Sequence, residues 1–239
     1  ALPPTRPVTI FCARDDIFPA LPDHARILRI PSLFERTGGE CDMDAVPTPD
    51  TLHCAPLGWP GIRQAMGTIA GWFADQDPAL MICDVSAEIA QLSRICSVPH
   101  VKILQHGQRD DPGHQAAYQG AAGLLAPFHA ALDQPDWQGL AGRIHHAPGL
   151  GIACTPLPDR AAARAALGLD PDRPMALLVS GAGGNGFAQA PLGVAARAFP
   201  DWHWLTIGAM QPDWHATQGG NLTHKGWVDD PATHVAAAD

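Results

Sequence analysis

The sequence predicts an α/β protein built on parallel sheets that helices cover on both faces. Two observations support this fold class. Short apolar runs with strand character alternate along the chain with segments of helical spacing, and most of these runs end in a polar or glycine-rich loop. Such alternation is typical of right-handed crossovers in doubly wound, Rossmann-like sheets. Ligands of such sheets bind beyond the carboxyl ends of the strands, so the loops there are the candidates for function.

The first predicted elements are two short strands and a long helix. Val8–Ala13 is an almost uninterrupted apolar run, and Arg26–Ile30 alternates between polar and apolar side chains, as a strand with one covered face does. Residues 31–60 are rich in Pro, Gly, Asp and Thr, which favours an irregular loop. Apolar residues then recur at helical spacing from Ile62 to Gln76, and Asp77-Pro78 ends this helix.

Five further elements complete the first half of the chain. Each predicted strand is a short apolar run, Ser86 is a suitable cap for the helix after it, and Pro99 turns the chain into the next strand. The predicted elements are the strand 80–83, the helix 87–96, the strand 101–104, the helix 114–120 and the strand 123–126.

A segment rich in glycine and proline, 148–158, predicts a linker between two domains, 1–150 and 151–239. After the linker the patterns predict the helix 160–167, the strand 175–180, the helix 192–198, and the strands 202–207 and 221–224. The chain opens almost directly into a strand and closes in a helical pattern at 236–239. We therefore expect the first domain to lack its opening strand and the second to be incomplete.

Composition excludes several classes of protein. The 239 residues carry a formal net charge of −9 and no basic run, which argues against general nucleic-acid binding. No apolar stretch has the length of a membrane span and the first residues are not a signal peptide, so we expect a cytoplasmic protein, with peripheral membrane contact left open. Six scattered cysteines without a C-x-x-C pair predict reduced thiols and no structural zinc.

The strongest functional signal is the glycine-rich stretch Ser180–Gly186, which follows an apolar strand and leads into a helix. Backbone N–H groups at such a turn favour a phosphate. A second glycine-containing strand exit, Gly226-Trp227-Val228, follows later in the chain. Together the two segments predict a nucleotide site. The alternative for the first is a tight turn without a ligand, and the alternative for the second is an ordinary strand end with Trp227 packed in the core.

With the upstream segments 84–90, 98–99, 106–109 and 124–127, these motifs resemble the GT-B glycosyltransferases. They are similar to the branch that contains the bacterial peptidoglycan N-acetylglucosaminyltransferase. The resemblance implies two Rossmann-like domains that face each other across a cleft, and transfer of a sugar from a nucleotide donor, expected to be a UDP-sugar, to an acceptor hydroxyl. The implied acceptor is a glycan, a lipid-linked molecule or a small molecule, and neither a metal nor a cofactor is expected.

The residues of the expected site fall into three groups. Backbone and side-chain groups for the donor are expected from Ser180, Gly181, Gly183, Gly184, Asn185, Gly186, Gly226, Trp227 and Val228. Asp84 and His106 are the catalytic candidates, because glycosyl transfer needs a base near the attacking oxygen; a helix-capping carboxylate is the alternative for Asp84. Arg109 is expected to bind the acceptor, or alternatively to pair with Asp110 or Asp111. The spacing of these two aspartates with His106 and His114 matches no common metal-ligand pattern.

Other functions remain open at this point. A nucleotide-sugar epimerase or hydrolase of the same fold is possible, as is a non-catalytic partner subunit that binds a nucleotide-sugar. A nicotinamide dehydrogenase fits poorly. Gly181, Gly183 and Gly186 satisfy G-x-G-x-x-G, but no acidic residue ends the next strand, 202–207, to hold a ribose.

Overall fold

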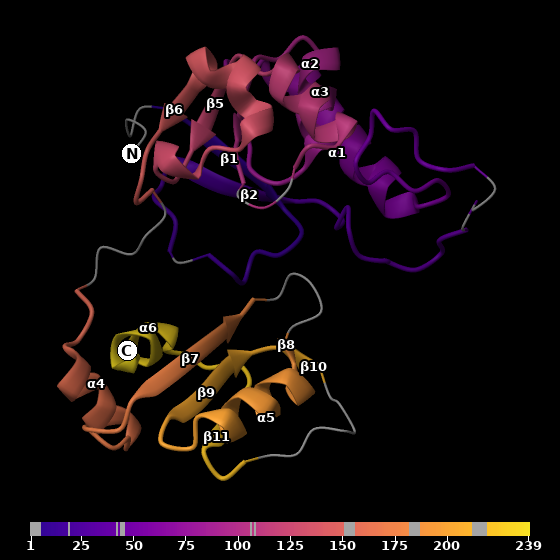
Figure 1. Cartoon of the computed structure of the whole chain (residues 1–239). Helices are drawn as coiled ribbons and strands as arrows, with labels where there is room; N and C mark the ends of the chain where they lie inside the picture. Colours follow the sequence, from indigo (N-terminus) through magenta and orange to yellow (C-terminus); the bar gives the residue numbers. More distant parts are fainter. Residues whose placement is uncertain are drawn as a thin grey trace. The chain divides into compact units, whose positions relative to one another are not determined.

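A computed structural model describes residues 6–18, 20–41, 43, 46–105, 107, 109–150, 156–181, 187–211 and 219–239. The chain divides into two compact units, Ala1–Ile152 and Ala153–Asp239 (Figure 1). Strands and helices alternate in both units, and every strand pair among the described residues is parallel. The predicted α/β class with parallel sheets is confirmed.

The first unit holds a four-stranded sheet, in the order β3-β4-β5-β6, and a separate β1-β2 pair. Its strands are β1 (Val8–Cys12), β2 (Ala25–Arg29), β3 (Met81–Cys83), β4 (His100–Ile103), β5 (Gly123–Ala126) and β6 (Ile144–His146). Its helices are α1 (Pro60–Gln76), α2 (Ala87–Ile95) and α3 (Pro112–Gly120), with 3₁₀ segments at Ala130–Leu132 and Pro135–Arg143. The 3₁₀ segments and β6 were not predicted. β6 is a short strand with two histidines, and it is defined by its pairing with β5.

Three apolar clusters form the interior of the first unit, and the smallest of them joins Cys83 to Ala87, Ala90 and Ala117. In one cluster, the side chains of Ile69 and Phe73 on the buried face of α1 pack with Val98. The second cluster contains Trp137, which is 1% exposed and contacts the ring of Tyr118 edge-on. Because Tyr118 belongs to α3 and Trp137 to a 3₁₀ segment, this cluster fixes α3 against the sheet and so positions the loop before it.

The second unit is built on a three-stranded sheet in the order β11-β9-β7, with a separate two-residue pair, β10-β8. Its strands are β7 (Met175–Ser180), β8 (Phe187–Ala188), β9 (His203–Gly208), β10 (Met210–Gln211) and β11 (Leu222–His224). Its helices are α4 (Arg160–Leu167), α5 (Gln189–Ala198) and α6 (Pro231–Ala237). The pair of β8 and β10 was not predicted, because two residues carry no readable periodicity.

Helices cover both faces of the second unit's sheet. On one face Leu205 of β9 packs with Ala163 of α4 and Ala237 of α6. On the other face Trp204, the preceding residue of β9, packs against the cluster of α5 that contains Leu192. Alternate residues of one strand thus enter opposite cores, and Figure 1 shows α4 and α6 on one side of the strands and α5 on the other. This is the predicted doubly wound arrangement.

Candidate functional site

Three strand ends lie side by side at the carboxyl edge of the second unit's sheet. Ser180 ends β7 and is paired in register with Gly208, which ends β9. The N–H of Gly208 donates a hydrogen bond of 2.7 Å to the carbonyl oxygen of Gly226, just after β11. Both glycines lack a side chain, so two of the three strand ends present mainly backbone at the edge where ligands of α/β sheets bind.

Gly208 is a residue of this sheet edge that the sequence interpretation did not single out. Its φ is +90°, and a Cβ placed on it would lie 1.8 Å from the carbonyl oxygen of Ser180. Only glycine fits this backbone and this close approach. The available signal was a glycine at the end of an apolar strand, after Ile207, a pattern too common to single out.

Trp227 is the one large aromatic side chain in the predicted base-binding segment 226–228. It is 66% exposed, so the alternative of a core tryptophan is wrong. Gly226 before it has φ +68° and no atom within 4 Å of its virtual Cβ. The segment then ends at α6, where Asp230 caps the helix by accepting the N–H of Thr233 at 3.0 Å. The indole is therefore held on a short connection between a strand and a capped helix.

The remaining predicted donor residues are Gly183, Gly184, Asn185 and Gly186, which lie outside the described residues. Gly181 is exposed, and no atom lies within 4 Å of its virtual Cβ. β7 precedes the loop as predicted, but the loop is followed first by the unpredicted two-residue strand β8 and only then by α5. α5 begins at Gln189 without a hydrogen bond from a capping side chain.

In the first unit, Asp84 follows β3 and is exposed. The alternative role for Asp84, capping of α2, is filled by Ser86, whose Oγ accepts the N–H of Ile89 at 3.2 Å. The main-chain oxygen of Asp84 accepts a hydrogen bond of 2.5 Å from Lys102 Nζ. Asp84 therefore lies at a strand exit that is fixed through its backbone, and its catalytic role stays a prediction.

Lys102 on β4 is a second residue that the sequence interpretation did not single out. It is fully buried, and its ammonium group donates to the carbonyl oxygens of Asp84 and, at 3.0 Å, Ile103. Burial lowers the pKa of Lys102 to about 8. Burial also raises the pKa of the Cys83 thiol to about 11. The ammonium group of Lys102 thus lies in the interior of the first unit and contacts the backbone of Asp84 at the end of β3.

A second polar group lies at the amino end of α3. The carboxylate of Asp111 caps this helix, accepting the backbone N–H of His114 at 3.1 Å and its ring Nδ1 at 2.7 Å. The Nδ1 of His53, from the long loop before α1, lies 3.4 Å from the same carboxylate oxygen. The two imidazole rings meet edge-on with centroids 4.3 Å apart. Burial lowers the pKa of His114, against the opposing effect of Asp111.

Of the two loop residues predicted to be functional, His106 lies outside the described residues. Arg109 is half-buried. Its charge adds to the effect of burial in lowering the pKa of Lys102 and His114, and it opposes the burial that raises the pKa of Tyr118 to about 12. Arg109 is therefore close to both polar groups of the first unit. Its role in acceptor binding stays a prediction.

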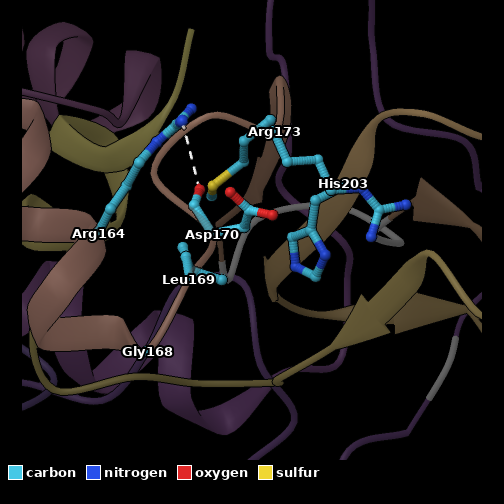
Figure 2. Close-up of a pocket in the computed structure, with 7 residues that line it drawn as sticks. Arg164, Gly168, Leu169, Asp170, Arg173 and His203 are labelled. Carbon is cyan, nitrogen blue, oxygen red and sulfur yellow. Dashed lines mark hydrogen bonds between the residues drawn. The ribbon is translucent and has the colours of Figure 1, made fainter.

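The pocket drawn in Figure 2 lies at the opposite, amino end of β7 and β9. Its lining includes Arg164, Arg173 and His203. The cations are already engaged: Arg164 Nη2 donates to the Asp239 carboxylate at 2.5 Å, and Arg173 donates to the carbonyl oxygens of residues 200, 201 and 202. These bonds join α4, the strand starts and the end of α6, so we interpret this pocket as structural.

Comparison with known proteins identifies the fold. No protein-family model matches the chain, and no match is found among curated proteins. Among solved structures, UGT89C1 of Arabidopsis thaliana, a plant UDP-glycosyltransferase, matches with a TM-score of 0.54 and 13% identity, over 94% of this chain and 63% of its own. The chain has the GT-B fold. MurG of Acinetobacter baumannii also matches, with a TM-score of 0.40 and 12% identity, over 90% of this chain and 57% of its own.

The GT-B fold consists of two Rossmann-like domains, and the match to UGT89C1 covers 94% of this chain. The chain spans 63% of the length of UGT89C1. Within the described ranges, the helices are all too short or too polar to cross a membrane.

Proposed function

We propose that the chain is a glycosyltransferase that binds a nucleotide-sugar, expected to be a UDP-sugar, at the carboxyl edge of the sheet β7-β9-β11. The observation that carries this proposal is the exposed indole of Trp227, which directly follows Gly226, a glycine with open space around its backbone. An exposed aromatic ring offers a face on which a base can stack. Main-chain groups of the segment 226–228 beside the ring would read the edge of that base.

The diphosphate of the donor would occupy the glycine-rich loop 181–186. Two elements support this assignment: β7 before the loop, and α5, which begins directly after the two-residue strand β8 that follows the loop. Phosphates bind at helix N-termini. α5 begins without a side-chain cap, so the N–H groups of its first turn are not satisfied by a capping side chain. A helix N-terminus in this position stabilises the negative charge that develops on the leaving diphosphate.

In the proposed reaction, the acceptor hydroxyl oxygen bonds to the anomeric carbon of the sugar while the bond from that carbon to the diphosphate oxygen breaks. The nucleoside diphosphate leaves with the bonding electron pair. A base takes the hydroxyl proton, and Asp84 and His106 are the candidates. Arg109 would bind the acceptor, whether a glycan, a lipid-linked or a small molecule. This transfer uses no metal ion and no cofactor.

Replacement of Trp227 by alanine is expected to weaken the binding of UDP by roughly 5- to 150-fold, which corresponds to the 1–3 kcal/mol of one base stacked on an aromatic ring. The measurement is a calorimetric titration of the full-length protein with UDP, GDP, dTDP and NAD in parallel. Wild type is expected to bind UDP or dTDP and to be stabilised by it against heat.

Trp202 provides a matched control within the same unit. It is 38% exposed and lies at the amino end of β9, so Trp202→Ala should leave nucleotide affinity unchanged. Equal loss in both variants would mean that general destabilisation explains the effect. Binding of NAD alone would replace the proposal by a dehydrogenase, and unchanged UDP binding by Trp227→Ala would remove this residue from the site.

Product analysis separates transfer from the other reactions open to this fold. With UDP-sugar and an acceptor, a transferase yields a new glycoside. Free sugar formed equally well with or without an acceptor would indicate a hydrolase, and an isomeric UDP-sugar would indicate an epimerase. Binding without any turnover would indicate a partner subunit that supplies only a nucleotide-sugar site.

A further inference from the structure

We propose that His53, Asp111 and His114 form a binding site for a divalent metal ion of the zinc class. Each residue offers one ligand atom, and the three atoms all lie within 4.8 Å of one another. Two imidazoles and one carboxylate suit zinc and similar borderline metals, and three protein ligands leave a fourth position for water. This site lies in the first unit and is independent of the proposed transfer reaction.

The two distances from the ligand atoms of the histidines to Asp111 Oδ2, 3.4 and 2.7 Å, bracket the distance that a tetrahedral ion requires. Bonds of about 2.0–2.1 Å place neighbouring ligand atoms roughly 3.3 Å apart. His53 Nδ1 already lies 3.4 Å from Asp111 Oδ2. His114 Nδ1 lies 2.7 Å from that oxygen, so the ion would replace the shared proton and separate this pair by roughly 0.6 Å.

The loop that carries His53 is held in place by a buried carboxylate. Glu88 is 7% exposed, and its Oε1 accepts the backbone N–H groups of His53 and Cys54 at 2.8 and 2.7 Å. Glu88 belongs to the first turn of α2. The backbone of His53 is thus fixed to a helix, although the residue lies in a long irregular loop.

Two further contacts bring this loop against α3. The side-chain amide of Gln91 donates to the carbonyl oxygens of Thr51 and Gly113, at 2.9 and 3.3 Å. A Cβ on Gly113 would lie 2.5 Å from the backbone nitrogen of His53, so only glycine permits this approach. Because the loop that carries His53 and the start of α3 are already held together before an ion binds, binding needs little further ordering of the chain.

The three ligand side chains differ in their exposure to solvent, as the ligands of an ion site do. The side chain of His114 is 4% exposed, whereas those of His53 and Asp111 are 45% and 36% exposed. One ligand is therefore buried and two line the opening to solvent. Sequence spacing predicted no metal site around Asp111 and His114, because it could not show that His53 joins them.

The test uses the full-length protein, freed of metal with a chelator and titrated with Zn²⁺ against a chromophoric zinc indicator. Wild type is expected to take up one ion at this site and to unfold at a higher temperature with Zn²⁺ present. His53→Gln and Asp111→Asn should each weaken binding by at least about tenfold. Asparagine caps helices as well as aspartate does, so the second variant keeps α3 intact.

His145→Gln is the control for adventitious binding, because His145 is an exposed histidine of the same unit. It should bind Zn²⁺ as wild type does. Co²⁺ gives a second readout, since the visible absorption of a tetrahedral cobalt site should appear in wild type and be absent in His53→Gln. Equal affinities in all four proteins, or no uptake by wild type, would overturn the proposal and leave Asp111 and His114 as a hydrogen-bonded cap of α3.

Discussion

Gly208→Ala is expected to lower the free energy of unfolding by roughly 4 kcal/mol or more, which is exceptional for one added methyl group. Two costs combine. The backbone has φ +90°, where a side chain costs about 1–2 kcal/mol. The new Cβ would also lie 1.8 Å from the Ser180 oxygen, which forces β7 and β9 apart. At roughly 2–4 °C per kcal/mol, calorimetry should show a fall in Tm of about 10 °C.

Two other glycines of the same unit separate these costs. Gly226 has φ +68° and no atom within 4 Å of its virtual Cβ, and Gly220 has equal space without a positive φ. Gly226→Ala should therefore cost only the conformational 1–2 kcal/mol, and Gly220→Ala should change stability by less than about 0.5 kcal/mol. A Gly208→Ala protein no less stable than Gly226→Ala would mean that the strand pair relaxes freely around the methyl group.

The elements that the sequence predicted well are those whose signal is local. The helix predicted from Ile62 to Gln76 ends where predicted and begins only two residues earlier, at Pro60. Ser86 caps α2 because a hydroxyl before an apolar run can satisfy the first free N–H groups. β8 and β10 escaped prediction because each has only two residues, too few for a period to be read. β6 has three residues, as the predicted β3 and β11 do, but two of them are histidines, so it lacks an apolar run.

The site was harder to predict because its contacts are not local. Gly226 and Trp227 could be chosen from their place after a predicted strand, but Gly208 matters through its approach to Ser180, which depends on register. His53 meets Asp111 only because Glu88 and a bare glycine hold its loop. None of these contacts leaves a pattern in the residues that flank it.

β4 reverses the usual rule of alternation along a strand. Its polar residues His100 and Lys102 are 1% and 0% exposed, whereas the apolar residues between them, Val101 and Ile103, are only partly buried. The sequence rule assigns apolar side chains to the core, so it gives no reason to expect a buried Lys102. The structure instead gives this lysine two carbonyl partners, which offset part of the cost of burying its charge.

The charge of Lys102 makes stability depend on pH in a direction that can be worked out. Its pKa in the folded protein is about 8, whereas a lysine of the unfolded chain titrates near 10.4. Between these values the unfolded chain holds a proton that the folded chain has released, so stability rises with pH. Below about pH 8 the full penalty is present, and it amounts to roughly 3 kcal/mol.

We therefore expect the free energy of unfolding of wild type, relative to that of Lys102→Met, to rise by about 1.4 kcal/mol between pH 7 and pH 9. The measurement is urea unfolding of both proteins at each pH. Methionine is unbranched like lysine and shorter by one atom. The packing and the donor lost to Asp84 and Ile103 cost the same at every pH, so the slope isolates the buried charge. Burial raises the pKa of the Cys83 thiol to about 11 and Lys102 only lowers it, so the thiol stays protonated up to pH 9 in both folded proteins and its effect cancels. Lys225→Met removes an exposed charge and shows what net charge alone does. Parallel profiles for wild type and Lys102→Met would mean that the buried ammonium group keeps its ordinary pKa, and that its two carbonyl partners offset burial completely.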